Sequence, residues 1–312
     1  MITAATLLLS TVQALLITST PSPSPTALRR AGAHARMAAA GGRMLRVCHR
    51  VEDVASVQDF YMKGLGMSSA TWLPDGRVQL GGGAGLHLEL QEVEGGGYEP
   101  KGGYLGLSVA VPDVQAAVDA ATAAGGSVLR AVETVEHGPT REEEDEVLNE
   151  LVEAVVADPA GYPILLHEAP STSAEGAATG EEAGAGADAD EADEAAGPVI
   201  SGVRASCHEW LQSQEWYEAT LGWSLLRWNS NVHREASLTL TLGPAGAAAG
   251  APVGPRGGAP TDGVIQLTYH YGCNPIASSG GLEAIVLAAA GGGGAAEMVD
   301  PDGYVLKLEE SA

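Results

Sequence analysis

Short stretches in which apolar and polar residues alternate recur along the chain and predict β-strands. In Gly85–Gln91, three leucines alternate with His87, Glu89 and Gln91. A period of two places the leucines on one face of a sheet and the polar side chains on the other. Val264–Tyr269 repeats the alternation. We expect the leucine faces to lie under helices and the polar faces to carry any chemistry.

The first half of the chain predicts two successive sets of strands and helices, which together make one domain over residues 43–170. The first set is a strand, a helix and a strand, and the second set follows the same order. The segments are Met44–Val51, Val54–Leu65 and Gly85–Gln91, then Tyr104–Val111, Val114–Ala124 and Leu151–His167.

Two motifs occur once in each half, in the same order. Asp53-Val54-x6-Phe60-Tyr61-x3-Leu65-Gly66-Met67 recurs as Glu209-Trp210-x5-Trp216-Tyr217-x3-Leu221-Gly222-Trp223, and Asp158-Pro159-Ala160-Gly161-Tyr162 recurs as Asp300-Pro301-Asp302-Gly303-Tyr304. Asp-Pro-x-Gly is typical of a turn, because Pro fixes one φ and Gly permits a positive one. The repetition predicts a second, shortened domain over residues 198–312. A Gly-rich gap between Leu287 and Met298 indicates that a helix and a strand are missing there.

The charge of the chain is concentrated in acidic segments. The formal net charge is −24, with one acidic run at 142–146 and a stretch from Glu175 to Glu194 that has no Lys or Arg. Such blocks are solvated, which predicts an acidic disordered linker over residues 171–197. The net charge argues against binding to nucleic acid or to anionic membranes, because polyanions are repelled.

The first 42 residues have the composition of a targeting segment. No Asp or Glu precedes Glu52, and an apolar run, Ala4–Ile17, is followed by a stretch rich in Ser, Thr, Pro and Arg. This order predicts import into an organelle, a plastid first, with secretion as the alternative, and no membrane span in the mature protein. Cys48, Cys207 and Cys273 have unrelated spacings, which predicts buried thiols rather than disulfides or a zinc motif.

Together these motifs resemble glyoxalase I (lactoylglutathione lyase) of the vicinal oxygen chelate superfamily, in its fused two-domain form. The resemblance covers residues 43–170 and 198–311. It implies an α+β fold of paired βαβββ modules that form open cupped sheets, and a monomer made by internal domain pairing. It also implies a nickel or zinc ion on two His and two Glu, which binds the hemithioacetal of methylglyoxal and glutathione while a carboxylate moves the proton.

Most of the family's ligand positions hold other residues in this chain. The resemblance implies two sites, each taking two ligands from each domain. One site is Arg46, Glu89, Glu283 and Lys307, and the other is Gly202, Gln266, Tyr104 and Leu165. The second site contains no convincing metal donor.

Two interpretations of the first site remain open. Two carboxylates with Arg⁺ and Lys⁺ sum to zero charge, as do two carboxylates, two neutral imidazoles and a divalent metal. An ion-pair cluster that replaces the metal is therefore one hypothesis, and the protein then needs no cofactor. In the other, His87, Glu89 and Glu283 retain the metal, and Glu89 and Glu283 are the catalytic carboxylates. His49 lies on the face opposite Arg46, which indicates a structural role.

The resemblance also implies ligand-binding positions. Arg50 occupies the place of a family Arg that holds a glutathione carboxylate, although a surface ion pair with Glu52 or Asp53 explains it equally well. His270 occupies the place of a family Asn beside the same ligand. Three functions follow: a glyoxalase I-like lyase, an inactive descendant that binds a small thiol-conjugated or polar ligand, and a metal-dependent dioxygenase. A dioxygenase needs two His and a carboxylate on one metal, which the matching positions do not supply.

Overall fold

The computed structural model describes residues 42–81, 86–99, 102–137, 149–168, 197–231, 236–244, 263–272, 280–289 and 295–310. The predicted targeting segment and the acidic linker lie almost wholly outside these ranges, as do the acidic run and Cys273. The division of the chain at residues 171–197 therefore stays a prediction. None of the helices in the described ranges is long and apolar enough to cross a membrane.

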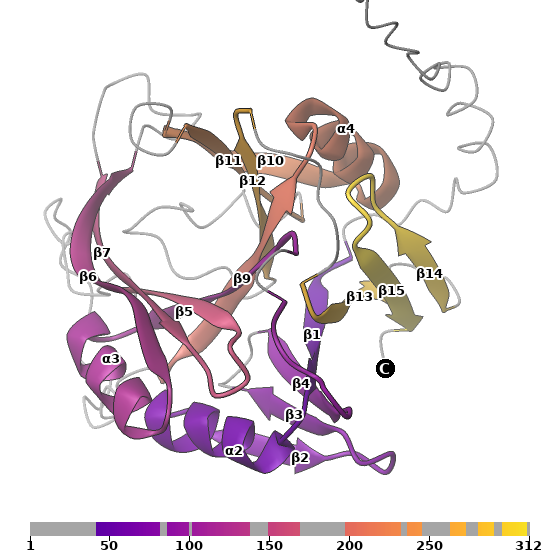
Figure 1. Ribbon diagram of the computed structural model, residues 1–312. Coiled ribbons are helices and arrows are strands. Elements are labelled where there is room, and N and C mark those ends of the chain that lie inside the picture. The colour runs from indigo at the N-terminus through magenta and orange to yellow at the C-terminus, as the bar shows by residue number, and fades with distance from the viewer. Residues whose placement is uncertain are drawn as a thin grey trace, which may run out of the picture. The chain divides into compact units, whose positions relative to one another are not determined.

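The described strands form two sheets, and each sheet joins strands from both halves of the chain (Figure 1). The seven-stranded sheet has the order β14-β15-β13-β1-β4-β3-β2. Its strands are β1 (Met44–Val51), β2 (Ser69–Trp72), β3 (Val78–Gly81), β4 (His87–Glu92), β13 (Leu282–Ala289), β14 (Ala296–Val299) and β15 (Val305–Glu310).

The eight-stranded sheet has the order β10-β11-β12-β9-β5-β8-β7-β6. Its strands are β5 (Tyr104–Val111), β6 (Ser127–His137), β7 (Asn149–Ala157), β8 (Pro163–Glu168), β9 (Val199–Cys207), β10 (Trp223–Asn231), β11 (Ser237–Pro244) and β12 (Val264–His270). Both sheets are mixed and open, as the predicted α+β fold of paired βαβββ modules requires. In the described residues the fourth module, β13–β15, has three strands and no helix.

Each sheet is joined at its centre by an antiparallel pair between the two halves. β1 pairs with β13, and β5 pairs with β9. Strand β1 also pairs in parallel with β4, so that Cys48 lies opposite Glu89. The polar face of β1 and β4 therefore continues directly onto β13 and β15, which come from the far end of the chain.

Helices cover the apolar faces, and aspartates cap the N-termini of two of them. Asp53 caps α2 (Val54–Asp59) and Asp113 caps α3 (Val114–Ala123), each by accepting a hydrogen bond from a backbone N–H three residues ahead. Helix α4 (Trp210–Leu221) ends at Gly222, which has a left-handed conformation at φ 68°.

Two predictions about the elements need correction. The helix predicted over Val54–Leu65 changes at Phe60 into a π-helical turn, η1 (Phe60–Gly64). The wider turn accompanies the complete burial of two neighbouring aromatic rings, Phe60 and Tyr61. The segment Leu151–His167 is two strands, β7 and β8, because the Asp158 turn separates them.

The repeated Asp-Pro-x-Gly motif is a turn that a helix tyrosine contacts. Asp158 Oδ1 accepts hydrogen bonds from the backbone N–H groups of Ala160 and Tyr162, both at 2.9 Å. Its other oxygen accepts a long hydrogen bond, 3.4 Å, from the Tyr61 hydroxyl. In the second half, Asp300 repeats the arrangement with Tyr217. The two motifs recur together in the sequence because they are in contact in the fold.

His49 lies in a buried aromatic cluster that contacts both sheets. Its Nε2 is 2.7 Å from the Tyr104 hydroxyl on β5, and its ring stacks on Tyr162 at 4.0 Å between centroids. Burial lowers the pKa of His49 to about 3, so the ring is neutral. The predicted structural role of His49 is confirmed.

Candidate functional site

The polar face of the seven-stranded sheet carries the candidate site. Arg46 and Cys48 point to this face from β1 because they are two residues apart, and Glu89 points to it from β4 beside Cys48. The opposite face of the same strands carries Val47, Leu88 and Leu90, all fully buried. The alternation seen in the sequence thus places the charged side chains away from the helices.

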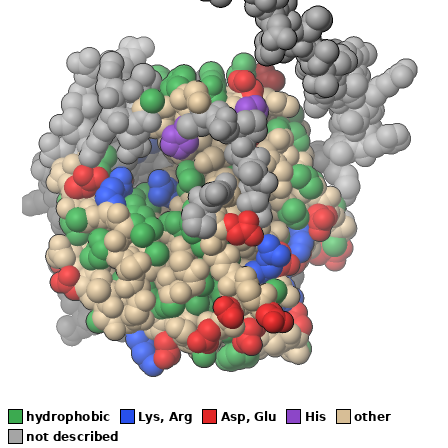
Figure 2. Space-filling model, in the orientation of Figure 1, with side chains coloured by type: hydrophobic (Ala, Val, Ile, Leu, Met, Phe, Trp, Pro, Cys, Tyr) green, Lys and Arg blue, Asp and Glu red, His purple; other side chains and the backbone are tan. Residues whose placement is uncertain are grey.

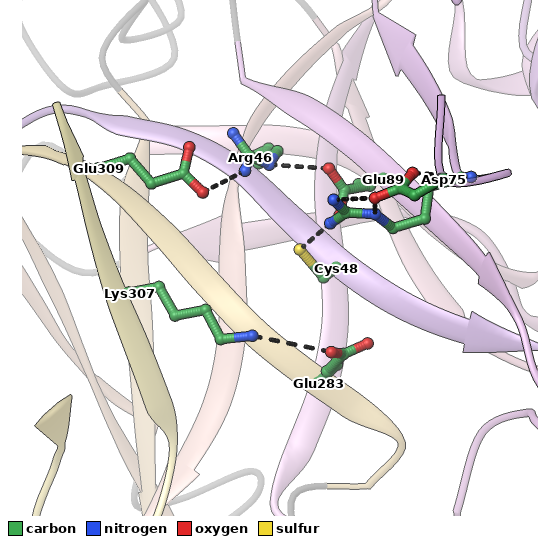
Figure 3. Close-up of polar contacts among 8 residues, drawn as sticks. Arg46, Cys48, Asp75, Glu89, Glu283, Lys307 and Glu309 are labelled. Carbon is green, nitrogen blue, oxygen red and sulfur yellow. Dashed lines mark hydrogen bonds and ion pairs between the residues drawn. The ribbon is translucent and has the colours of Figure 1, made fainter. Parts of the chain in front are cut away.

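Glu89 lies between two guanidinium groups (Figure 3). Arg46 Nε is 2.9 Å from Glu89 Oε2. Arg77, from the turn before β3, donates to the other oxygen, Oε1. The Glu89 side chain is only 2% exposed. A buried carboxylate is tolerated where both of its oxygens contact cationic donors, and Glu89 meets that condition.

Two outer carboxylates complete the network. Arg46 donates to Glu309 on β15, and Arg77 Nε donates to Asp75 at 2.7 Å. The hydrogen bond from Arg77 lowers the pKa of Asp75. We call these five residues the arginine network: Arg46, Asp75, Arg77, Glu89 and Glu309. It holds two cations and three carboxylates.

Cys48 lies beneath the network. Its Sγ is 3.4 Å from Glu89 Oε1 (Figure 3). Burial and the neighbouring Glu89 carboxylate raise the pKa of the Cys48 thiol to about 12. The thiol therefore stays protonated at neutral pH, and a protonated thiol is a poor nucleophile and a poor metal ligand.

Glu283 and Lys307 form a separate and looser pair on the same sheet. Lys307 Nζ is 3.7 Å from Glu283 Oε1, and both side chains are about one third exposed, at 37% and 32%. The hydrogen bonds and ion pairs drawn in Figure 3 link this pair to none of the other residues shown. The four-residue cluster expected from the sequence is thus divided: Arg46 and Glu89 are in contact, while Lys307 and Glu283 contact each other.

The residues present do not fit the metal that the fold family implies. The oxygens of Glu89 already contact Arg46 and Arg77, and a protonated guanidinium cannot ligate a cation. In the described ranges, no three His, Cys, Asp or Glu side chains are close enough together to hold a metal ion. His87, Glu89 and Glu283 therefore do not make such a group.

The other predicted ligand residues, His87, Arg50 and His270, take no part in the hydrogen bonds and ion pairs that define the arginine network. His87 pairs with Arg46 across the strands, and its ring lies against the backbone of Gly81, where a Cβ atom would come within 2.4 Å of Nδ1. Arg50 is exposed at the end of β1, and its carbonyl accepts a hydrogen bond from Tyr162. His270 ends β12, which belongs to the other sheet.

The second predicted site is only partly assembled on the eight-stranded sheet. Gly202 lies opposite Ser108, which in turn lies beside Leu165, so these share one face. Gln266 lies beside Arg204, two residues along β9 on that same face. Tyr104 differs from the expectation: it pairs with Ala205, whose side chain points the other way, and its hydroxyl contacts His49 in the core.

Sequence reasoning missed Arg77, Asp75 and Glu309. Arg77 comes from a turn, and no periodic pattern links a turn residue to the face of a distant strand. Glu309 is two residues beyond Lys307 on β15, so it points to the same face. The alternation Lys307, Leu308, Glu309 was a signal that could have included it.

Comparison with known proteins agrees with this fold. Residues 46–167 match the family described as "Glyoxalase-like domain". Glyoxalase I from Zea mays is similar in structure, with a TM-score of 0.59 and 21% identity over 86% of this chain and 92% of that one. A single-residue variant of the maize enzyme has a TM-score of 0.58 and 22% identity, over 86% of this chain and 94% of that one. Among curated proteins the sequence finds no match. The described residues thus have the fold of two-domain glyoxalase I, with a glyoxalase-like domain in the first half.

Proposed function

We propose that this protein binds a small polar or thiol-conjugated ligand on its cupped sheets and does not catalyse metal-dependent isomerisation of a hemithioacetal. The glyoxalase I fold supports binding of a small molecule in a cupped sheet. The residues at the metal position support the loss of the metal-dependent reaction. The fold thus favours binding of a small molecule, whereas the residues at the metal position argue against the metal-dependent reaction. The residues of the site, rather than the fold, decide the function.

One observation carries the proposal: both oxygens of Glu89 contact guanidinium groups. A metal centre of this type polarises substrate oxygens as a Lewis acid, and it needs an open coordination position and deprotonated ligands. Glu89 is the ligand residue that the chain retains at its family position, and it is buried between Arg46 and Arg77. A metal ion would have to displace at least one of these two cations.

The competing candidate is a glyoxalase I-like lyase that detoxifies methylglyoxal. It is favoured by the structural similarity to an enzyme named glyoxalase I, from Zea mays. For this chain it would require that Glu89 and Glu283, with His87, gather around nickel or zinc. In the structure Glu283 contacts Lys307 instead.

A single assay separates the two candidates. Metal-stripped protein is mixed with the hemithioacetal of methylglyoxal and glutathione, and turnover is followed before and after adding nickel or zinc. We expect no increase with either metal, while maize glyoxalase I treated in the same way regains its activity. In parallel, calorimetry with glutathione measures binding to the same metal-free protein.

The decisive variant is Glu89→Gln. Turnover that rises with metal and disappears in Glu89→Gln would overturn the proposal. The control is Glu283→Gln, which alters a partly exposed pair on the same sheet and leaves the arginine network intact. Absence of turnover together with glutathione binding to both variants would support the proposal.

A further inference from the structure

The eight-stranded sheet carries a row of polar side chains that no metal chemistry explains. Arg204 on β9 lies beside Gln266 on β12, Gln266 lies opposite Thr241 on β11, and Thr241 lies opposite Arg227 on β10. Residues paired across neighbouring strands point to the same face of a sheet. We call these four residues the polar row; a guanidinium is at each end, and an amide and a hydroxyl are between them.

The polar row lies on the face turned away from the helices. The residues on either side of it along the strands, such as Val203, Ile265 and Leu242, are fully buried on the opposite face. In Figure 1 the eight-stranded sheet curls between β7 and β12, and Figure 2 shows Lys and Arg side chains beside a hollow in this part of the surface. Arg204, Gln266 and Arg227 are half-buried, so each is within reach of a ligand on this face.

The spacing of the two arginines suits a ligand with two negative ends. Three strand spacings separate β9 from β10, which is about 14 Å between their backbones. Each guanidinium can bind a carboxylate through two parallel hydrogen bonds.

The acidic side chains described on the same face lie at its far wall. Arg130 contacts Glu153 at 3.0 Å and Glu133 at 3.4 Å, and these residues belong to β6 and β7. Arg204 and Arg227 take part in interactions of their own within the protein. A ligand at this end of the sheet would therefore add its contacts to those that the two arginines already make within the protein.

We infer that the polar row is a binding site for a small linear dicarboxylate, with Arg204 and Arg227 each holding one carboxylate and Gln266 contacting the chain between them. The inference rests on the proposed function, because it names the class of the small polar ligand. It concerns the eight-stranded sheet, whereas the metal question concerns the seven-stranded one.

A series of linear dicarboxylates from succinate to suberate tests the inference on the full-length protein. Calorimetry should show one preferred chain length, bound at least tenfold more tightly than butyrate, because only a ligand of matched length reaches both guanidinium groups. Arg204→Gln and Arg227→Gln should each reduce the affinity for that dicarboxylate about tenfold and leave butyrate binding within about threefold.

The controls separate a site from general charge attraction. Lys63→Gln removes an exposed cation, 71% exposed, that lies outside both sheets and should change nothing. Arg204→Lys keeps the charge without the bidentate geometry and should lose affinity while the fold, followed by circular dichroism, is retained. Equal loss in Lys63→Gln, no preference for length, or tighter binding of inorganic phosphate than of any dicarboxylate would overturn the inference.

The two proposals fail separately. Metal-restored turnover with intact dicarboxylate binding would overturn only the proposed loss of the lyase reaction. Absence of dicarboxylate binding together with glutathione binding at another place would overturn only the role of the polar row.

Discussion

Arg46 Nε lies 2.9 Å from Glu89 Oε2, on neighbouring strands of the seven-stranded sheet. The resemblance to glyoxalase I aligns Arg46 with a metal-binding histidine of that family and Glu89 with a metal-binding glutamate. On that alignment, two guanidinium groups, from Arg46 and Arg77, contact the Glu89 carboxylate at the place where the resemblance implies a metal cation.

Glu89→Gln should destabilise the fold, because it leaves Arg46 and Arg77 without their shared carboxylate. Removing one partner of a buried ion pair costs about 3–5 kcal/mol, and partial exposure of the two arginines reduces this to about 2–4 kcal/mol. Urea unfolding measures the change. Glu283→Gln, in the exposed pair, should cost less than about 1 kcal/mol. Equal costs for the two variants would contradict the central role of Glu89.

Nickel should leave the melting temperature of the protein unchanged, since none of the described groups can hold it. The variant Arg46→His/Glu283→His/Lys307→Glu restores the family's two His and two Glu at the corresponding positions, and its melting temperature should rise with nickel. A ligand at a hundred times its Kd stabilises by about 2.7 kcal/mol. The same variant with Glu89→Gln should lose the response. A nickel response in the unaltered protein would contradict this prediction.

The sequence predicted the sheets better than it predicted the network. Alternation identified β4 and β12, because strands with one buried face have a period of two, and the segments of β1 and β5 were also predicted as strands. The repeated turn located the start of the last strand in each half. Strands β2, β3, β6, β10, β11 and β14 were missed. β2, for example, is a short edge strand with Trp72 60% exposed, so its pattern does not show a buried face.

The candidate site was predictable only where it follows strand positions. Arg46, Glu89, Glu283 and Lys307 were identified through the family's positions, and the structure places all of them on one sheet. Their pairing was not predictable, because it depends on Arg77 and on Glu309, which approach from a turn and from the last strand. A charge balance counted along the sequence cannot tell which carboxylate each cation contacts.

Gly106 should tolerate no side chain. It lies on β5 at φ 105°, and a Cβ atom there would come within 1.8 Å of the Pro163 carbonyl oxygen on β8. Gly106→Ala must therefore separate two paired strands, at a cost of about 3 kcal/mol or more. Gly76 is the matched control: its φ is 85°, nothing lies within 4 Å of the added Cβ, and Gly76→Ala should cost about 1–2 kcal/mol. Thermal unfolding compares the two.

Asp158 should make the protein less stable as the pH rises from about 4 to about 7. Burial raises the pKa of this carboxyl to about 7 in the folded state, against about 3.9 in the unfolded chain. Between these values the folded state binds more protons than the unfolded state, so the free energy of unfolding falls with rising pH. The contribution of Asp158 to stability is fully present below its pKa in the unfolded chain. It is lost as the pH rises through its pKa in the folded state, about 7.

Asp158→Asn isolates that contribution, because an amide oxygen can still accept from the N–H groups of Ala160 and Tyr162. We expect the variant to show a shallower fall in unfolding free energy between pH 4 and 7, measured by urea titration at each pH. Asp300→Asn should also make the fall in unfolding free energy shallower, over a pH range that ends nearer pH 6, because burial raises the pKa of Asp300 to about 6. Parallel pH curves for Asp158→Asn and the unaltered protein would show that the carboxyl stays ionised in the turn, with its backbone hydrogen bonds outweighing its burial.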